Sequence, residues 1–127
     1  MAAVIRFTTN AFDVTRERKN PINPIYGESL LLWLRQQTMG RIPMARPEPE
    51  DWGWYSDLEW NGRAYMLGAV SMDGENGQRE WVLQIVKHRT IKEKLLRRER
   101  MGPEDECAEF FRRILAAEPR FSDVSLD

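Results

Sequence analysis

The chain has 127 residues, of which 42% are hydrophobic and 31% are charged, and 19 basic residues face 20 acidic ones for a net charge of -1. This length and polarity are typical of one globular domain, so we expect residues 1–127 to form a single domain. The one cysteine excludes an intramolecular disulfide and a cysteine-rich zinc site, and the near-neutral charge does not favour a polyanionic partner.

The first third of the chain predicts a strand, a helix and a connector. Residues 3–9 are rich in β-branched and aromatic side chains, with Ile5, Phe7 and Thr9 on one face, which favours a strand. Asn23 and Pro24 suit the N-cap and first position of a helix that ends before Gly40. Residues 41–51 contain three prolines and predict an extended connector that leads from this helix to the sheet.

The strongest structural signal is the pair Asn61-Gly62, which lies between two runs of alternating side chains, residues 52–60 and 63–71. Asn-Gly favours positive φ at both central positions of a type I′ turn, so the two runs predict a β-hairpin. Pairing outward from the turn sets Trp60 opposite Arg63.

The two faces of this hairpin differ in character. One face is apolar, and we expect it to be the core under the helices, with Trp60 only half covered at the tip; this face holds Trp52, Trp54, Leu58, Trp60, Tyr65, Leu67 and Ala69. The other face mixes apolar and acidic residues. There we expect the ring of Tyr55 to cover the bare backbone of Gly68.

Residues 80–88 follow a Gly-rich turn and predict a third strand of the meander, whose register the turn leaves undecided. Thr90 and Glu93 fit a capping box, which predicts a helix through about Met101. A second helix is predicted to begin at Pro103, because proline is favoured at the first helical position.

The predicted fold class is α+β. We expect an antiparallel sheet of about four strands with helices packed on one face, in the chain order strand, helix, three strands and two helices. The last residues, 122–127, follow the final helix and are expected to form a loose tail.

The sequence carries no catalytic or cofactor signature. Nucleotide-binding glycine motifs and the nucleophile elbow do not occur, so no cofactor is predicted. His88 is the single histidine and is flanked by two bases, while Cys107 falls on a predicted apolar helix stripe. Asp57 and Glu59 have a spacing that glycosidase carboxylates can share, but no third polar group is placed beside them. These observations favour a protein that is not an enzyme.

We therefore expect a non-catalytic protein-binding module, of the inhibitor or immunity type used by bacteria and phages. No signal-peptide pattern or long apolar run occurs, which favours a cytoplasmic location without a membrane partner. Five acids and no base lie between Arg46 and Arg63, and Trp and Arg are enriched in interface hot spots. The candidate binding residues are Asp57, Glu59, Trp60 and Arg63.

Two alternatives stay open. The first is a small-ligand or enzymatic domain with a pocket between the proline-rich connector and the sheet, lined by Tyr26, Tyr55, Asp57 and Arg63. The second is nucleic-acid binding through the predicted helix 90–101, whose secondary basic patch is Lys94, Arg97 and Arg98. The second is the weaker, because the chain is not basic overall and no aromatic residues are interleaved with these bases.

Overall fold

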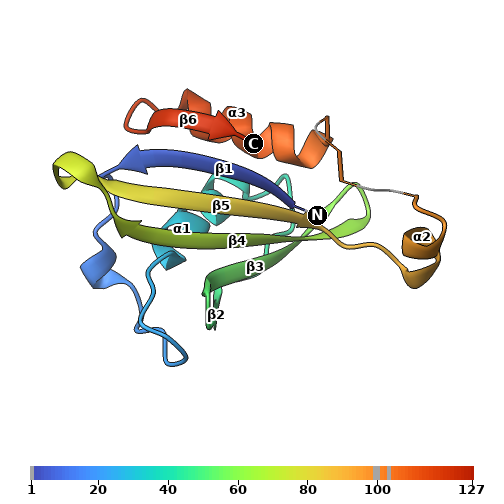
Figure 1. Ribbon diagram of the computed structural model, residues 1–127, viewed down its shortest axis with the longest axis horizontal. Coiled ribbons are helices and arrows are strands. Elements are labelled where there is room, and N and C mark those ends of the chain that lie inside the picture. The colour runs from blue at the N-terminus through green and yellow to red at the C-terminus, as the bar shows by residue number, and fades with distance from the viewer. Residues whose placement is uncertain (1, 99–100, 103) are drawn as a thin grey trace.

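The computed structural model describes residues 2–98, 101–102 and 104–127. Within these residues, six strands form one antiparallel sheet in the order β2-β3-β4-β5-β1-β6 (Figure 1). The strands are β1 (Ala2–Thr9), β2 (Glu48–Glu50), β3 (Gly53–Trp60), β4 (Arg63–Asp73), β5 (Arg79–Lys87) and β6 (Ser122–Leu126). The helices are α1 (Glu28–Thr38), α2 (Ile91–Leu95) and α3 (Glu106–Ala117), with 3-10 turns η1 (Val14–Arg16) and η2 (Glu75–Gly77). The α+β class is confirmed, but the expected number of about four strands is too small.

The hairpin of β3 and β4 forms as its turn predicts. Asn61 and Gly62 have φ of 49° and 79°, the positive values that an Asn-Gly turn favours. Trp60 pairs with Arg63 at the tip, and the same register continues to Trp54 opposite Ala69. On its other side β4 pairs with β5, which fixes the register that the sequence left open and makes these two strands the centre of the sheet.

Both additional strands lie where the sequence predicted irregular chain. β2 is part of the connector 41–51, which follows the edge of β3 and also bridges Met44 to Leu58. β6 replaces the expected loose tail and pairs with β1, with Leu126 opposite Ile5. The side chains of β6 have weak strand preference, so its pairing depends on the backbone groups that the edge of β1 offers.

Two helix boundaries also differ from prediction. α1 begins at Glu28 rather than Pro24, and Asn23 instead donates its side-chain amide to the carbonyl of Asp51. The capping box of Thr90 and Glu93 is present, but α2 ends at Leu95 instead of continuing to Met101. The chain leaves the helix there because Arg97 has a φ of 55°, which is not helical.

α3 begins after its predicted start. The expected first helical residue, Pro103, lies outside the described residues, and Asp105 is the N-cap, accepting a hydrogen bond from the amide of Ala108. Cys107, Phe111 and Leu115 form the buried side of the helix.

The core lies between the sheet and the layer formed by α1 and α3. Burial of each large apolar side chain stabilises the fold by about 1.5 to 3 kcal/mol, before the entropy cost of ordering that side chain is subtracted. The largest fully buried apolar side chains come from both layers: Ile5, Leu30, Leu31, Leu34, Trp54, Leu67, Trp81, Leu83, Ile85, Phe111 and Leu115.

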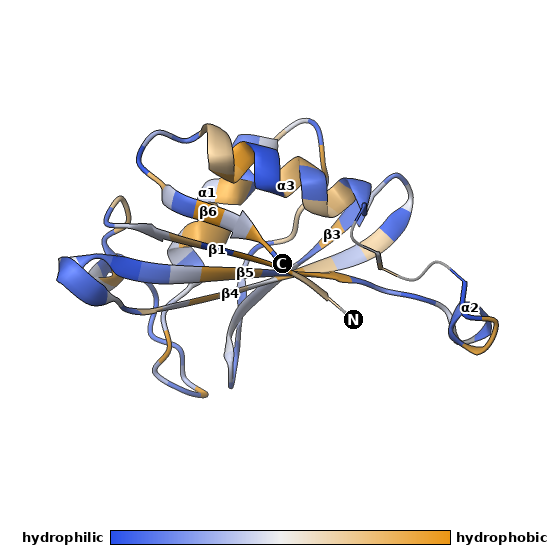
Figure 2. Ribbon diagram, turned by 45° about the horizontal axis from the view of Figure 1, so that its top comes forward, coloured by the Kyte–Doolittle hydropathy of each residue, from blue (hydrophilic) through white to orange (hydrophobic). Residues whose placement is uncertain are grey.

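The opposite face of the sheet has no helix over it in the part of the chain that the structure describes. Figure 2 shows α1 and α3 together on one side of the strands, while α2 stands beyond the end of the sheet. None of the described helices has the length and apolar composition that crossing a membrane requires.

Candidate functional site

The structure divides the four predicted binding residues between the two faces of the sheet. Trp60 and Arg63 lie on the side of the helices, whereas Asp57 and Glu59 are exposed on the side without helices. Successive strand residues point to opposite faces, so the hairpin cannot bring all four side chains to one site.

Arg63 fixes the start of α2. Its guanidinium forms a bidentate pair with Glu93, with Nη1–Oε1 and Nη2–Oε2 distances of 2.9 and 2.7 Å, and Nη1 also donates to the carbonyl of His88 at 3.2 Å. The hydrogen bonds from Arg63 lower the pKa of Glu93 to about 2. Arg63 therefore joins the hairpin tip to the segment that leaves β5.

A cleft of about 520 Å³ separates the hairpin tip from the start of α3. Trp60 lines it and also contacts Phe110, with 5.0 Å between ring centroids. The Tyr65 hydroxyl donates to Asp105 Oδ2 at 2.8 Å, and burial and this carboxylate raise the pKa of Tyr65 above its ordinary range. Asp105 also caps α3 through its other oxygen, so these polar groups hold the helix in place.

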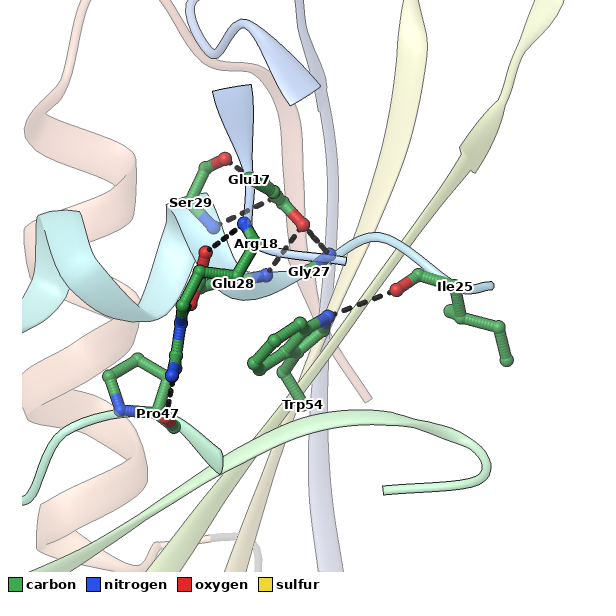
Figure 3. Close-up of polar contacts among 8 residues, drawn as sticks. All are labelled: Glu17, Arg18, Ile25, Gly27, Glu28, Ser29, Pro47 and Trp54. Carbon is green, nitrogen blue, oxygen red and sulfur yellow. Dashed lines mark hydrogen bonds and ion pairs between the residues drawn. The ribbon is translucent and has the colours of Figure 1, made fainter. Parts of the chain in front are cut away.

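The carboxylate of Glu17 occupies the N-terminus of α1 (Figure 3). It accepts hydrogen bonds from the amides of Gly27, Glu28 and Ser29 at 3.0, 3.1 and 2.9 Å, and from the Ser29 hydroxyl at 2.6 Å. A helix N-terminus attracts anions, but here the chain supplies its own. The sequence prediction missed this cap because Glu17 lies eleven residues before the first residue of the helix.

Arg18 and Glu28 connect the segment before α1 to the connector (Figure 3). Glu28 is buried and pairs with the guanidinium of Arg18, whose Nη2 donates to the carbonyl of Pro47 at 2.7 Å. The Cζ atom of the same guanidinium lies 5.2 Å from the ring centroid of Trp54. The indole N–H of Trp54 donates to the carbonyl of Ile25 at 3.0 Å. These contacts stabilise two loops against the sheet.

The connector and the sheet do line a cavity of about 660 Å³, between residues 43–45 and residues 57–59, but the four residues of the expected ligand pocket are not all brought together there. Tyr26 bridges to Ser71 near one end of β4, whereas Arg63 begins β4 at the other end, about 26 Å away at 3.3 Å per residue. In the described part of the chain, no group of three or more His, Cys, Asp or Glu side chains is placed to hold a metal ion.

The predicted basic patch lies on a projection that we call the basic arm, residues 88–98. Lys94, Arg97 and Arg98 are exposed, but they do not share a helical face because α2 ends at Leu95. Leu95 is 78% exposed and Leu96 is 51% exposed. The arm therefore presents apolar and basic side chains together. Figure 1 shows α2 beyond the end of the sheet.

The face of the sheet without helices, which we call the open face, has an apolar centre. Antiparallel sheets that face water usually carry polar residues on that side. Here Met72 is 45% exposed and Trp52 is 36% exposed, and the Trp52 ring lies against Gly68. The other apolar side chains of the centre are partly buried by neighbouring strands and lie around the exposed amide of Gln84: Val4, Tyr55, Met66, Val70, Val82 and Val86.

Acidic residues border this apolar centre along the β2–β3 edge of the sheet and at the start of β5. We call them the acidic rim: Glu48, Asp57, Glu59 and Glu80, all exposed. Of the described strand residues that point to the open face, Arg6 is the basic one. Its Nε atom forms an ion pair with Asp127 Oδ2 at 3.3 Å. The open face therefore combines exposed apolar area with net negative charge.

Comparison with protein-family models, with curated proteins and with solved structures finds no match for this chain.

The open face could have been inferred from one feature of the sequence. Val82, Gln84 and Val86 alternate with the core residues Trp81, Leu83 and Ile85, so both faces of this strand are at least partly apolar. Such a pattern is typical of a central strand, and it equally fits a strand with one face available to a partner.

Proposed function

We propose that this chain is a non-catalytic protein-binding module of the inhibitor or immunity kind, and that it binds its partner on the open face. The observation that carries the proposal is the apolar centre within the acidic rim. Contiguous exposed apolar area with a polar border is typical of a protein interface.

The chemistry of the open face indicates the kind of partner. Met, Trp and Tyr are enriched at interfaces, and Met72, Trp52 and Tyr55 lie on this face. Asp57 and Glu59 at its edge would pair with bases and would mainly raise the rate of association. We therefore propose a partner that carries an apolar patch bordered by lysine or arginine.

Site-specific photo-crosslinking in the native cell tests this proposal. A benzophenone side chain at Met72 probes the open face, and the same side chain at Gln36, exposed on α1, is the matched control. We expect one stoichiometric adduct with another protein from position 72 and none from position 36. Equal labelling from both positions, or no adduct from position 72, would contradict the proposal.

Binding measurements with the purified partner then test which side chains of the open face contribute to affinity and to the association rate. Met72→Asp places a charge in the exposed apolar centre, and we expect it to weaken binding by about 30-fold or more, the effect of losing one hot spot. Asp57→Lys should lower the association rate and its dependence on salt. Both positions are exposed, so circular dichroism and the melting temperature should stay as in the wild type.

A further inference from the structure

We propose that, in the free protein, the open face is occupied by the basic arm of a second copy of this chain. This inference rests on the proposed function, because it takes the open face to be a docking surface. It goes further by naming an occupant and by giving the basic arm a role.

The root of the basic arm is fixed to the body of the molecule. Thr90 and Glu93 close the capping box, with Thr90 Oγ1 accepting from the Glu93 amide at 3.1 Å and Glu93 Oε1 accepting from the Thr90 amide at 2.9 Å. Arg63 holds the same carboxylate, and the amide of Arg98 donates to the carbonyl of Glu93 at 2.8 Å. The arm is therefore an ordered turn and not a free tail.

The arm exposes apolar side chains that its own body does not cover. Leu95 and Leu96 are adjacent at the far end of the arm and both are mainly exposed. Figures 1 and 2 show α2 beyond the end of the strands, well away from the open face of its own sheet. Because Arg63 and Glu93 fix the arm in this position, its leucines do not lie on the open face of their own sheet.

The arm and the open face are complementary in charge and in polarity. The arm carries two leucines among bases, and the open face carries an apolar centre within acids. The bases are Arg89, Lys92, Lys94, Arg97 and Arg98. Since the whole chain has a net charge of only -1, two copies do not repel each other strongly at a distance.

A reciprocal exchange of basic arms between two copies covers both kinds of surface in one dimer. If each copy places its arm on the open face of the other, both pairs of leucines and both apolar centres are covered, and a twofold axis closes the assembly. A protein partner with a basic border would then compete with the arm for the same face. The dimer would thus hold the open face covered until that partner displaces the arm.

Charge reversal and mixing test this exchange. The arm-reversed variant is Lys94→Glu, Arg97→Glu and Arg98→Glu, and the face-reversed variant is Asp57→Lys, Glu59→Lys and Glu80→Lys. All six positions are exposed, so both variants should fold, which circular dichroism checks. The matched control carries Arg16→Glu, Lys19→Glu and Arg46→Glu, exposed positions outside the arm.

Sedimentation equilibrium at low ionic strength should show a wild-type dimer whose dissociation constant rises with salt. We expect each reversed variant alone to dissociate at least about tenfold more readily, and the control to dimerise like the wild type. An equal mixture of the two reversed variants should restore a dimer, because an acidic arm then meets a basic face and a basic arm meets an acidic face.

Three results would overturn the exchange: a wild type that stays monomeric at every concentration, an arm-reversed variant that dimerises normally, or a mixture that does not associate. A benzophenone at Leu95 adds a direct readout. Its adduct should map to the open face of a second copy, and an adduct with a different protein or with lipid would also overturn the proposal. None of these results affects the adduct with a different protein that is expected at Met72. That adduct therefore tests partner binding separately from the exchange.

Discussion

At Gly68 the open face depends on the absence of a side chain. A Cβ at this position would lie 2.7 and 2.8 Å from two ring atoms of Trp52. The sequence predicted that Trp52 would lie in the core, which is wrong, and that Tyr55 would cover this glycine, whereas the nearest ring is that of Trp52. Gly53 has a φ of 151°, a conformation that favours glycine, and the chain turns there so that Trp52 and Trp54 lie on opposite faces.

We predict that Gly68→Ala lowers the free energy of unfolding by about 1 to 3 kcal/mol, because the added methyl forces the Trp52 ring from its place. Urea denaturation measures the change. In a Trp52→Ala background the same substitution should be neutral or stabilising, since alanine suits a strand better than glycine. Equal losses in both backgrounds would show that the ring is not the cause.

At the scale of the element, the start of α1 is set by a residue outside the helix. Glu17 satisfies three backbone amides that have no partner within the helix. The local sequence at Asn23 and Pro24 looks like a helix start, but Asn23 bonds to the β2–β3 turn instead. The competing tertiary contacts therefore move the start of the helix to Glu28.

We predict that Glu17→Ala lowers the free energy of unfolding by about 1 to 2 kcal/mol, because it leaves helix amides without an acceptor. Glu17→Gln should cost less, since the amide oxygen can still accept. Glu75→Ala removes an exposed acid in η2 and is the control, with an expected change within about 0.5 kcal/mol. A Glu17→Ala protein as stable as this control would refute the capping role.

At the scale of the whole molecule, one helical layer covers one face of the sheet, and the buried apolar side chains of the described residues form one core there. Cys107 lies in that core, and burial raises the pKa of its thiol from 9.0 to about 12. The folded protein therefore keeps this proton over a pH range in which the unfolded chain loses it. Stability must then fall as pH rises through this range.

We predict that the free energy of unfolding decreases from about pH 9 towards pH 12, by at most about 1.4 kcal/mol per pH unit for this group. Cys107→Ala should flatten the decrease, and Tyr65→Phe should flatten it further because burial raises that pKa as well. Urea denaturation at several pH values measures the slopes. An unchanged slope in Cys107→Ala would show that the thiol does not contribute.

The sequence by itself determined the features whose interactions are local. The Asn61-Gly62 turn fixes its own hairpin register, and Thr90 with Glu93 forms a capping box within one helical turn. The grouping of the candidate binding residues depends on more than local sequence, because the structure places them on two faces of the sheet. Alternation along the hairpin was read from the sequence, but the four candidates were grouped by their nearness to its tip and not by the face to which they point.

Only the tertiary structure decided the features that join distant parts of the chain. Pairing of β6 with β1 brings together the two ends of the sequence, and no local preference of Ser122–Leu126 predicts it. The apolar pattern of β5 is the same whether helices cover one face or both. Which face stays open depends on where α1 and α3 pack, and that is a property of the assembled layers and not of any single segment.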